Sequence, residues 1–373
     1  MMKQCIVTSE ELEQIDFTTT VIFGFYTGGK ESYFTDTCLT LMHRFPESDI
    51  IGCSSESNIY NHMPHVCDST EDLCIFLCLD IQKGAYYIDL YQTKEIPKSL
   101  KEYEGKYGGL MFCSRYFENL EKVIYDLQSS KNVKPLFGAI AGVSEKSKRE
   151  SGFVFWNGTY YPDHILLWLV DQDRYLLEGK SSHHFQPVGF DLEVTRAEGT
   201  ILHEIENRPA HEVLEEIVGK ITKETIASFD HPFFLKENAK IPFKHSPLCS
   251  IRAVDKKHGS IYLYRSVQER YKLKVGVSLG REEQEKQLAE FATLRKKRNA
   301  VAFLFNCVGI KANLGSMEFV YLMDLKKRLH MPIIGFHSFG EIGTTNQEHY
   351  SMLHNQTISI AVLSERSKHA VDK

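Results

Sequence analysis

The chain has 373 residues, a formal net charge of −5 and hydrophobic residues at 42% of its positions. This length exceeds the size at which one hydrophobic core usually stops growing, so we expect two domains. Because no dense basic stripe alternates with aromatic residues, a nucleic-acid-binding function is disfavoured. The first residues are acidic where a signal peptide is apolar, and no run reaches the ~18 apolar residues of a membrane span. The sequence predicts a soluble, cytoplasmic protein.

Nine cysteines are scattered along the chain, which favours a reducing compartment over a disulfide framework. Cys74 and Cys78 share one face of a strand-like segment, which predicts core packing. His62, His65 and Cys67 form the tightest group of possible metal ligands, but they lack a fourth partner at a standard zinc spacing. We therefore predict a polar surface loop there, and neither a metal nor a cofactor.

The first predicted unit is a strand, a helix and a second strand. An apolar run at residues 21–25 precedes an amphipathic segment, and the apolar residues 50–51 lead into a turn of small and polar residues. This turn contains Cys53, Ser54 and Ser55. Glycine lets the backbone approach a guest closely, and short polar side chains offer hydrogen bonds at the end of a rigid strand. The turn is therefore a candidate ligand site.

A degenerate second unit follows at residues 109–142, where LMFCS and LFGAIAG flank a helical pattern. Two further strands are predicted at 153–156 and 165–170, on either side of the turn NGTYYPD. Short β-like runs then alternate with turns until a helix starts at Pro209, because proline suits the first helical turn.

A proline-containing polar connection follows to residue 248, then a strand at 261–264 and a charged helix at 281–298. We interpret the RKKR run at 295–298 as the cationic, solvated end of that helix. The domain boundary is placed between residues 205 and 206, and residues 364–373 form a polar tail.

The third unit repeats the design of the first. A strand at 301–307 ends in Cys307, and a strand at 333–334 leads into a turn that contains Gly335, His337, Ser338, Gly340 and Glu341. An offset of 283 residues relates Gly52 to Gly335 and Ser55 to Ser338. One strand-helix-strand unit is therefore reused, which predicts an α/β (α+β mixed) fold of two related domains with mixed sheets flanked by helices. We expect the two serine-bearing turns to converge around a small-molecule cavity.

Several of these segments resemble the FIST domain, a two-part intracellular sensory module. The segments that match its C-terminal half are FNCVG at 305–309, PIIGFHSFGEI at 332–342 and LHNQT at 353–357. The segments that match its N-terminal half are IIGCSS at 50–55, LFGAIAG at 136–142, PVGFDLEVTRAEG at 187–199 and ENRPAHEVL at 206–214. Ile310 stands where the family commonly has arginine, and the early turn reads SSESNI where glycine and glutamate are common. If either charged group holds a ligand in the family, this chain binds a different ligand or binds it less tightly.

The resemblance implies an N-terminal FIST domain over residues 1–205, a C-terminal FIST domain over 206–363, and a sensory function. Such a module is expected to bind a small ligand, an amino acid or related metabolite. It would signal through a separate protein partner, or the chain is part of a longer signalling protein.

Residue chemistry agrees with binding, because a zwitterion needs a carboxylate for its ammonium and hydroxyls or amides for its carboxylate. Glu341, Ser338 and Asn355 have these groups, although Asn355 and Gln356 could equally satisfy buried backbone groups. The predicted ligand-binding residues are Cys53, Ser54, Ser55, Cys307, Gly335, His337, Ser338, Gly340, Glu341, Asn355 and Gln356.

Two alternatives stay open. One is a cysteine-dependent, hydrolase-like enzyme that uses Cys307 or Cys53 with His337 or His354 as base. No recognisable spacing joins a cysteine, a histidine and an orienting carboxylate, so we predict no enzymatic activity. The other alternative is a non-catalytic scaffold that binds another protein.

Overall fold

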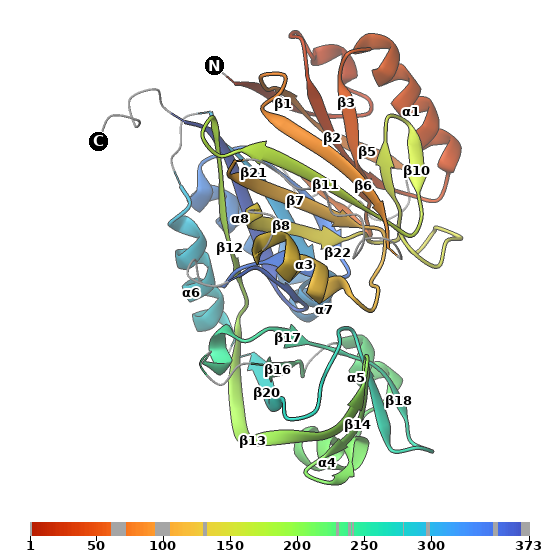
Figure 1. Cartoon of the computed structure of the whole chain (residues 1–373), viewed down its shortest axis with the longest axis vertical. Helices are drawn as coiled ribbons and strands as arrows, with labels where there is room; N and C mark the ends of the chain where they lie inside the picture. The colour runs from red at the N-terminus through yellow and green to blue at the C-terminus, as the bar shows by residue number, and fades with distance from the viewer. Residues whose placement is uncertain are drawn as a thin grey trace.

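The computed structural model describes residues 2–60, 72–93, 105–129, 133–228, 231–237, 240, 242–278, 280–295, 299–345 and 350–366. These residues form a large body of mixed sheets and helices, with a smaller β domain below it in Figure 1. The predicted α/β class is therefore confirmed. The possible metal ligands His62, His65 and Cys67 lie outside the described residues, as do residues 296–298 of the RKKR run.

The large body contains three copies of one strand-helix-strand unit. In each copy a helix connects two strands that pair in parallel. The copies are β2 (Val21–Thr27), α1 (Glu31–Arg44) and β3 (Asp49–Ser54); β7 (Tyr107–Cys113), α3 (Leu120–Ser129) and β8 (Val133–Ile140); and β21 (Val301–Cys307), α8 (Glu318–Leu329) and β22 (Ile333–Ser338). In the third copy α7 (Val308–Leu314) precedes α8. The repeat predicted from the sequence is confirmed, including its degenerate second copy.

Two antiparallel strands complete each unit. β5 (Leu73–Asp80), β11 (His164–Asp171) and β25 (Ile358–Glu365) pair with the first strands of the three units. Outside them lie β1 (Lys3–Thr8), β6 (Tyr86–Gln92) and β12 (Tyr175–Ser182). The three sheets therefore share one strand order.

The short strand that follows the second strand of each unit pairs with the second strand of another unit. β4 (Asn58–Tyr60) follows β3 but pairs with β22, and β23 (Glu341–Gly343) follows β22 but pairs with β8. β9 (Val154–Trp156) follows β8 and pairs with β3, which closes the cycle. β10 (Thr159–Tyr161) and β24 (Met352–His354) extend the sheets beyond β9 and β23. We call the three connections before β4, β9 and β23 the exchange turns.

One glycine per unit fits the second strand closely against the first. A Cβ atom added at Gly52, Gly138 or Gly335 would lie 1.8, 1.9 or 1.8 Å from a carbonyl oxygen of the parallel partner strand. These distances are far below van der Waals contact, so the strands can approach only at glycine. The glycine spacing in the sequence therefore marks a packing requirement of the repeat.

Aromatic side chains from all three units fill a shared core. The ring of Phe23 lies 5.1 Å from that of Trp168 and 5.0 Å from that of Phe303, both edge to face, a favourable geometry for aromatic pairs. Cys74 and Cys78 are buried on the other face of the first sheet, beneath α1. Their predicted core packing is confirmed.

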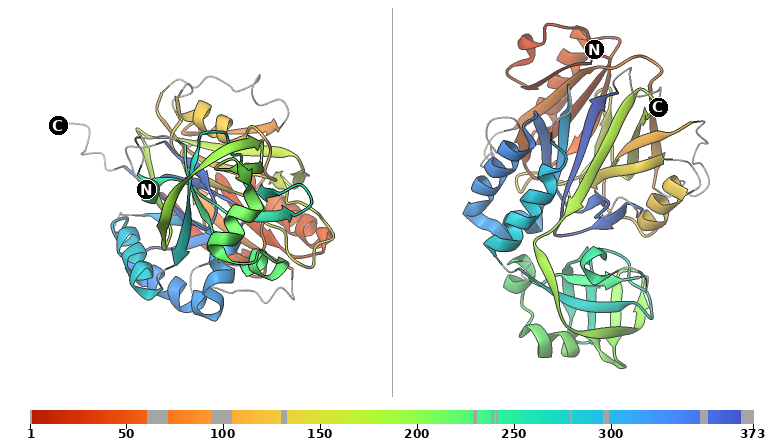
Figure 2. Two further views of the ribbon diagram at one scale, coloured as in Figure 1. Left: turned by 90° about the horizontal axis from the view of Figure 1, so that it is seen from below. Right: turned by 90° about the vertical axis from the view of Figure 1, so that its left-hand side faces the viewer.

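The smaller domain is an antiparallel sheet covered by two short helices, α4 (Ala210–Val218) and α5 (Lys223–Ser228). Its strands are β13 (Phe185–Glu198), β14 (Ile201–Ile205), β15 (Arg208–Pro209), β16 (Phe233–Lys236), β17 (Leu248–Cys249), β18 (Ile251–Asp255), β19 (Ser260–Leu263) and β20 (Lys272–Ser278). β12 runs directly into β13, and Phe185 of β13 lies opposite Ser278 of β20, so the chain enters and leaves the domain side by side (Figure 2).

Some of the elements predicted for the smaller domain and the helix after it are present in the structure. Pro209 caps α4, and α6 (Arg281–Ala292) lies in the predicted charged helix but ends earlier. β16 forms inside the segment predicted to be a connection, because its apolar residues are buried between β17 and β20. The predicted boundary at residues 205 and 206 falls between β14 and β15, and the domain limits stay a prediction.

Candidate functional site

The first exchange turn meets the end of β22 at the backbone. Glu56 N donates a hydrogen bond to His337 O at 3.2 Å, and His337 N donates to Ser57 O at 2.8 Å. Gly142 of the remaining turn packs against both, because a Cβ atom there would lie 2.3 Å from Glu56 N and 2.7 Å from His337 O. The two turns related by the 283-residue offset are therefore in contact, and the second unit contributes to the same place through Gly142.

A network of polar side chains, which we call the His337 network, lies at this contact and comprises Glu56, Ser57, Lys311, Glu318 and His337. His337 Nδ1 is 2.7 Å from Ser57 Oγ, and His337 Nε2 is 2.6 Å from Glu318 Oε1. Lys311 Nζ donates to both Glu56 oxygens, at 3.0 and 2.8 Å, and to Ser57 Oγ at 3.0 Å. Burial alone would raise the pKa of Glu56, but the neighbouring Lys311 and His337 lower it below its usual value.

The network has the residue types of a serine hydrolase triad, but its geometry favours a structural role. Ser57 is 1% exposed, and its hydroxyl already contacts His337, Lys311 and Glu56. A nucleophile must reach its substrate, whereas this hydroxyl is enclosed by protein groups. The network therefore joins the first unit to α7, α8 and β22 of the third.

A second buried group, the Cys307 cluster, comprises Cys307, Ser338, Glu341 and Gln356. Ser338 Oγ donates to Glu341 Oε1 at 2.6 Å, and Gln356 N donates to Cys307 Sγ at 3.1 Å. Burial raises the pKa of Glu341 well above its ordinary value, and burial together with Glu341 raises that of Cys307. The raised pKa favours the neutral form of Glu341, which is a weaker partner for a ligand ammonium than the carboxylate expected from the sequence.

Residues 354–356 tie the large body to the smaller domain. Asn355 N donates to Leu248 O at 3.1 Å, and Asn355 Oδ1 accepts from Ser250 N at 3.4 Å. Gln356 Nε2 donates to Ser250 Oγ at 3.3 Å. His354 is fully buried, and burial with the nearby Arg265 lowers its pKa to about 3, so its imidazole is neutral.

Three of the predicted residues belong to the framework. Cys53 is 0% exposed in the aromatic core, and burial raises its pKa well above the usual value. Gly335 is required by the close approach of β21 and β22 described above. Gly340 O accepts a hydrogen bond from Ile140 N at 2.8 Å, which holds the turn before β23 on the second unit.

A small open pocket lies beside the first exchange turn, and we call it the serine pocket. It stands at the carboxyl ends of the parallel strands β2 and β3, where open α/β sheets usually bind ligands. Its lining combines glycines, hydroxyls and two opposite charges: Gly28, Gly29, Glu31, Ser54, Ser55, Ser144, Ser147, Arg149 and Ser151, with Tyr26, Val143 and Phe153.

Arg149 and Glu31 face each other in the serine pocket. Arg149 Nη2 lies 2.9 Å from Glu31 Oε1, and the side chains are 24% and 49% exposed. The guanidinium also lies over the rings of Phe153 and Tyr160, at 5.1 and 4.7 Å from their centroids, which fixes its position by cation–π attraction. Arg149 Nε is buried and has no hydrogen-bond partner among the described residues.

Ser54 and Ser55 are the predicted residues that line this pocket, and their hydroxyls already bond to protein. Ser54 Oγ donates to Gly142 O at 2.9 Å, and Ser55 Oγ lies 2.6 Å from Asn58 Oδ1. Glu31 and Arg149 were not predicted from the sequence. Two signals pointed to them: the glycine pair before a helix in GGKE, and the serine-rich loop SEKSKRES after LFGAIAG.

The fold and its polar turns define a module built from three related α/β units with an inserted β domain. Residues 21–208 match the FIST N domain and residues 210–344 match the FIST C domain. The chain belongs to the FIST family, whose domains are sensory domains of signal transduction. The resemblance seen in the sequence is therefore confirmed. A search of curated proteins found no match. Among the helices of the described residues, none combines the length and apolar character needed to cross a membrane.

Proposed function

We propose that this protein is a non-catalytic cytoplasmic sensor, which binds a small amino-acid-like ligand in the serine pocket and signals through a separate protein partner. The observation that carries the proposal is the Arg149–Glu31 pair in a pocket rich in serine. An α-amino acid presents an ammonium and a carboxylate close together, so it can exchange this direct ion pair for two ligand-mediated ones.

The polar lining supports the same ligand class. Arg149 offers a planar fork of donors that suits a carboxylate, and its aromatic neighbours hold it in place. Ser144, Ser147 and Ser151 offer hydroxyls that can donate or accept.

The cytoplasmic location is supported by the thiols. The cysteines within the described residues are free, at positions 5, 38, 53, 74, 78, 113, 249 and 307. A protein of an oxidising compartment commonly pairs its cysteines.

A thermal-shift screen of amino acids against the full chain tests the proposal. A ligand at ~100 times its Kd stabilises the folded state by about 2.7 kcal/mol, which raises Tm by about 3 °C for a chain of this size. We expect Arg149→Gln to abolish the shift. Arg174→Gln removes a similar exposed pair with Asp171 and is the matched control, which should keep the shift.

The Glu31→Gln variant tests the contacts of the ligand's ammonium and carboxylate separately. This variant should lose the response to the amino acid, because the ammonium loses its carboxylate. It should retain binding of the deaminated carboxylic acid through Arg149. If no amino acid shifts the wild-type Tm and pull-down yields a stoichiometric protein partner, the scaffold alternative replaces this proposal.

A further inference from the structure

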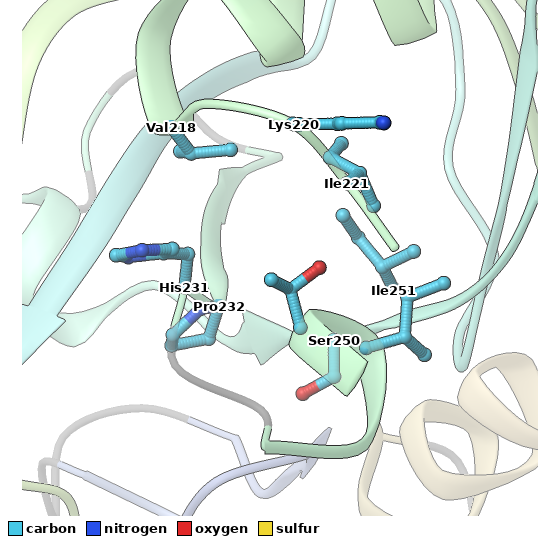
Figure 3. A pocket seen from close by; sticks show the side chains of 9 residues that line it. Val218, Lys220, Ile221, His231, Pro232, Ser250 and Ile251 are labelled. Atoms are coloured by element: carbon cyan, nitrogen blue, oxygen red, sulfur yellow. The ribbon is translucent and has the colours of Figure 1, made fainter. Parts of the chain in front are cut away.

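The smaller domain contains an open cavity that differs in chemistry from the serine pocket. It lies between α4, α5 and the strands β16 to β18. Apolar side chains form most of the wall: Val218, Ile221, Ile226, Pro232 and Ile251. Figure 3 shows Ile221 and Ile251 on one side and His231 with Pro232 on the other.

The polar groups at this cavity favour an anion. Lys220 and His231 are exposed at its edge, and none of its described lining residues is acidic. The nearby Glu215 is already engaged, because its Oε1 accepts from Lys256 Nζ at 2.7 Å and from Ile221 N at 3.1 Å. Lys220 makes no ion pair within the described part of the chain. An ammonium beside an apolar wall is suited to a carboxylate with an aliphatic tail.

The cavity is also connected to the C-terminal family motif. Ser250 lines it, and the Ser250 hydroxyl accepts the hydrogen bond from Gln356 Nε2 at 3.3 Å. Gln356 N in turn donates to Cys307 Sγ at the start of α7. α5 also packs against α7. An occupant of the cavity therefore lies directly behind the junction between the two parts of the molecule.

We propose that this cavity is a second ligand site, which binds a short branched aliphatic carboxylate with its tail against Ile221 and Ile251 and its carboxylate at Lys220. The site is distinct from the serine pocket in position and in ligand chemistry. Occupancy fills the space beside Ser250, and so it stabilises the contact of the smaller domain with residues 355 and 356.

Isothermal titration of the full chain with sodium 3-methylbutanoate tests this site, with 3-methylbutanamide as the neutral ligand of the same shape. We expect the acid to bind at least about tenfold more tightly than the amide, because a charge-assisted hydrogen bond is roughly twice as strong as a neutral one. Lys220→Gln should lower the affinity for the acid to that for the amide. Lys223→Gln removes an exposed lysine of α5 that does not line the cavity, and it should leave both affinities unchanged.

Two more variants test whether the acid binds in this cavity and not in the serine pocket. Ile226→Phe fills the cavity at a half-buried position and should abolish binding of both ligands, with an unchanged Tm as the check on folding. Arg149→Gln should leave the acid's affinity unchanged, whatever happens to amino-acid binding. The proposal is overturned if the folded chain binds neither ligand, if acid and amide bind alike, or if Arg149→Gln removes binding while Lys220→Gln does not.

Discussion

Cys307 illustrates how burial controls the chemistry of a side chain. It ends a strand next to a family motif, which suggested a nucleophile, yet it is 4% exposed and its pKa is raised first by burial and then by Glu341. Cys5 is the contrasting thiol, since a hydrogen bond from Cys78 lowers its pKa and it is partly exposed. Only the thiolate is a good nucleophile.

We therefore expect iodoacetamide near neutral pH to modify Cys5 first and Cys307 at least about 100-fold more slowly than a free cysteine. Peptide mapping by mass spectrometry after timed labelling measures both rates in one sample. Labelling in 8 M urea is the control, because it should make the two cysteines equally reactive. Rapid modification of Cys307 in the folded chain would revive the cysteine-enzyme alternative.

Lys311 offers a test of the His337 network. Its side chain is 25% exposed and that of Glu56 is 17% exposed, so the pair is partly shielded from water. Lys311→Met leaves the Glu56 carboxylate without its cation, and we expect the free energy of unfolding to fall by about 2 kcal/mol. Urea denaturation measures the loss. Lys122→Met, which breaks the exposed pair with Asp126, is the control and should change stability by less than about 0.5 kcal/mol.

At the scale of elements, Gly335 shows why the repeat needs glycine. Gly335→Ala would place a methyl group 1.8 Å from Leu304 O, so β21 and β22 must separate. We expect a loss of at least about 3 kcal/mol in urea denaturation. Gly84→Ala is the control, because nothing lies within 4 Å of its Cβ position and its φ of +79° costs only about 1 kcal/mol. Equal losses in the two variants would refute the packing argument.

The same glycines explain what sequence could predict about these elements. A glycine that must contact a carbonyl recurs at a fixed place in each unit. The units and their parallel strand pairs could therefore be predicted from the spacing of these glycines in the sequence. The pairing of β4, β9 and β23 with other units could not be predicted from the sequence, because each strand is three residues long and pairs with a strand distant in sequence. Glu31 and Arg149 were missed for a related reason, since packing of the first unit against the loop after the second brings them together.

Across the whole molecule, buried histidines make the junction of the two parts sensitive to acid. His184 and His354 are both 0% exposed. Burial is the main cause that lowers the pKa of both, to about 3 for His354. His184 lies between β12 and β13, and His354 lies beside the contact with β17, so both occupy the junction.

The sign of the pH dependence follows from these lowered values. Well above pH 6.5 both histidines are neutral whether the chain is folded or unfolded. Below it the unfolded chain binds protons that the folded chain does not, so stability falls by up to about 1.4 kcal/mol per pH unit for each histidine. For His354 the loss continues until the pH reaches about 3.

Urea denaturation at pH 7.5 and pH 5.5 measures this dependence while most carboxylates stay charged. We expect the wild type to lose stability over this interval and His354→Gln to lose less. His258→Gln changes an exposed histidine paired with Asp255, and it should follow the wild type. Identical slopes for all three proteins would show that these histidines do not govern the junction.

The adjacent entry and exit strands at Phe185 and Ser278 make residues 185–278 a cassette. Among the described residues, every strand of the three large sheets lies outside that segment, so its removal and replacement by a tight reverse turn disrupts no strand pairing of those sheets. Insertions, deletions and wholesale exchange of the cassette can therefore accumulate without shifting the register of the core. Evolution, or a protein engineer, can alter one recognition surface of this molecule while the other stays as it is.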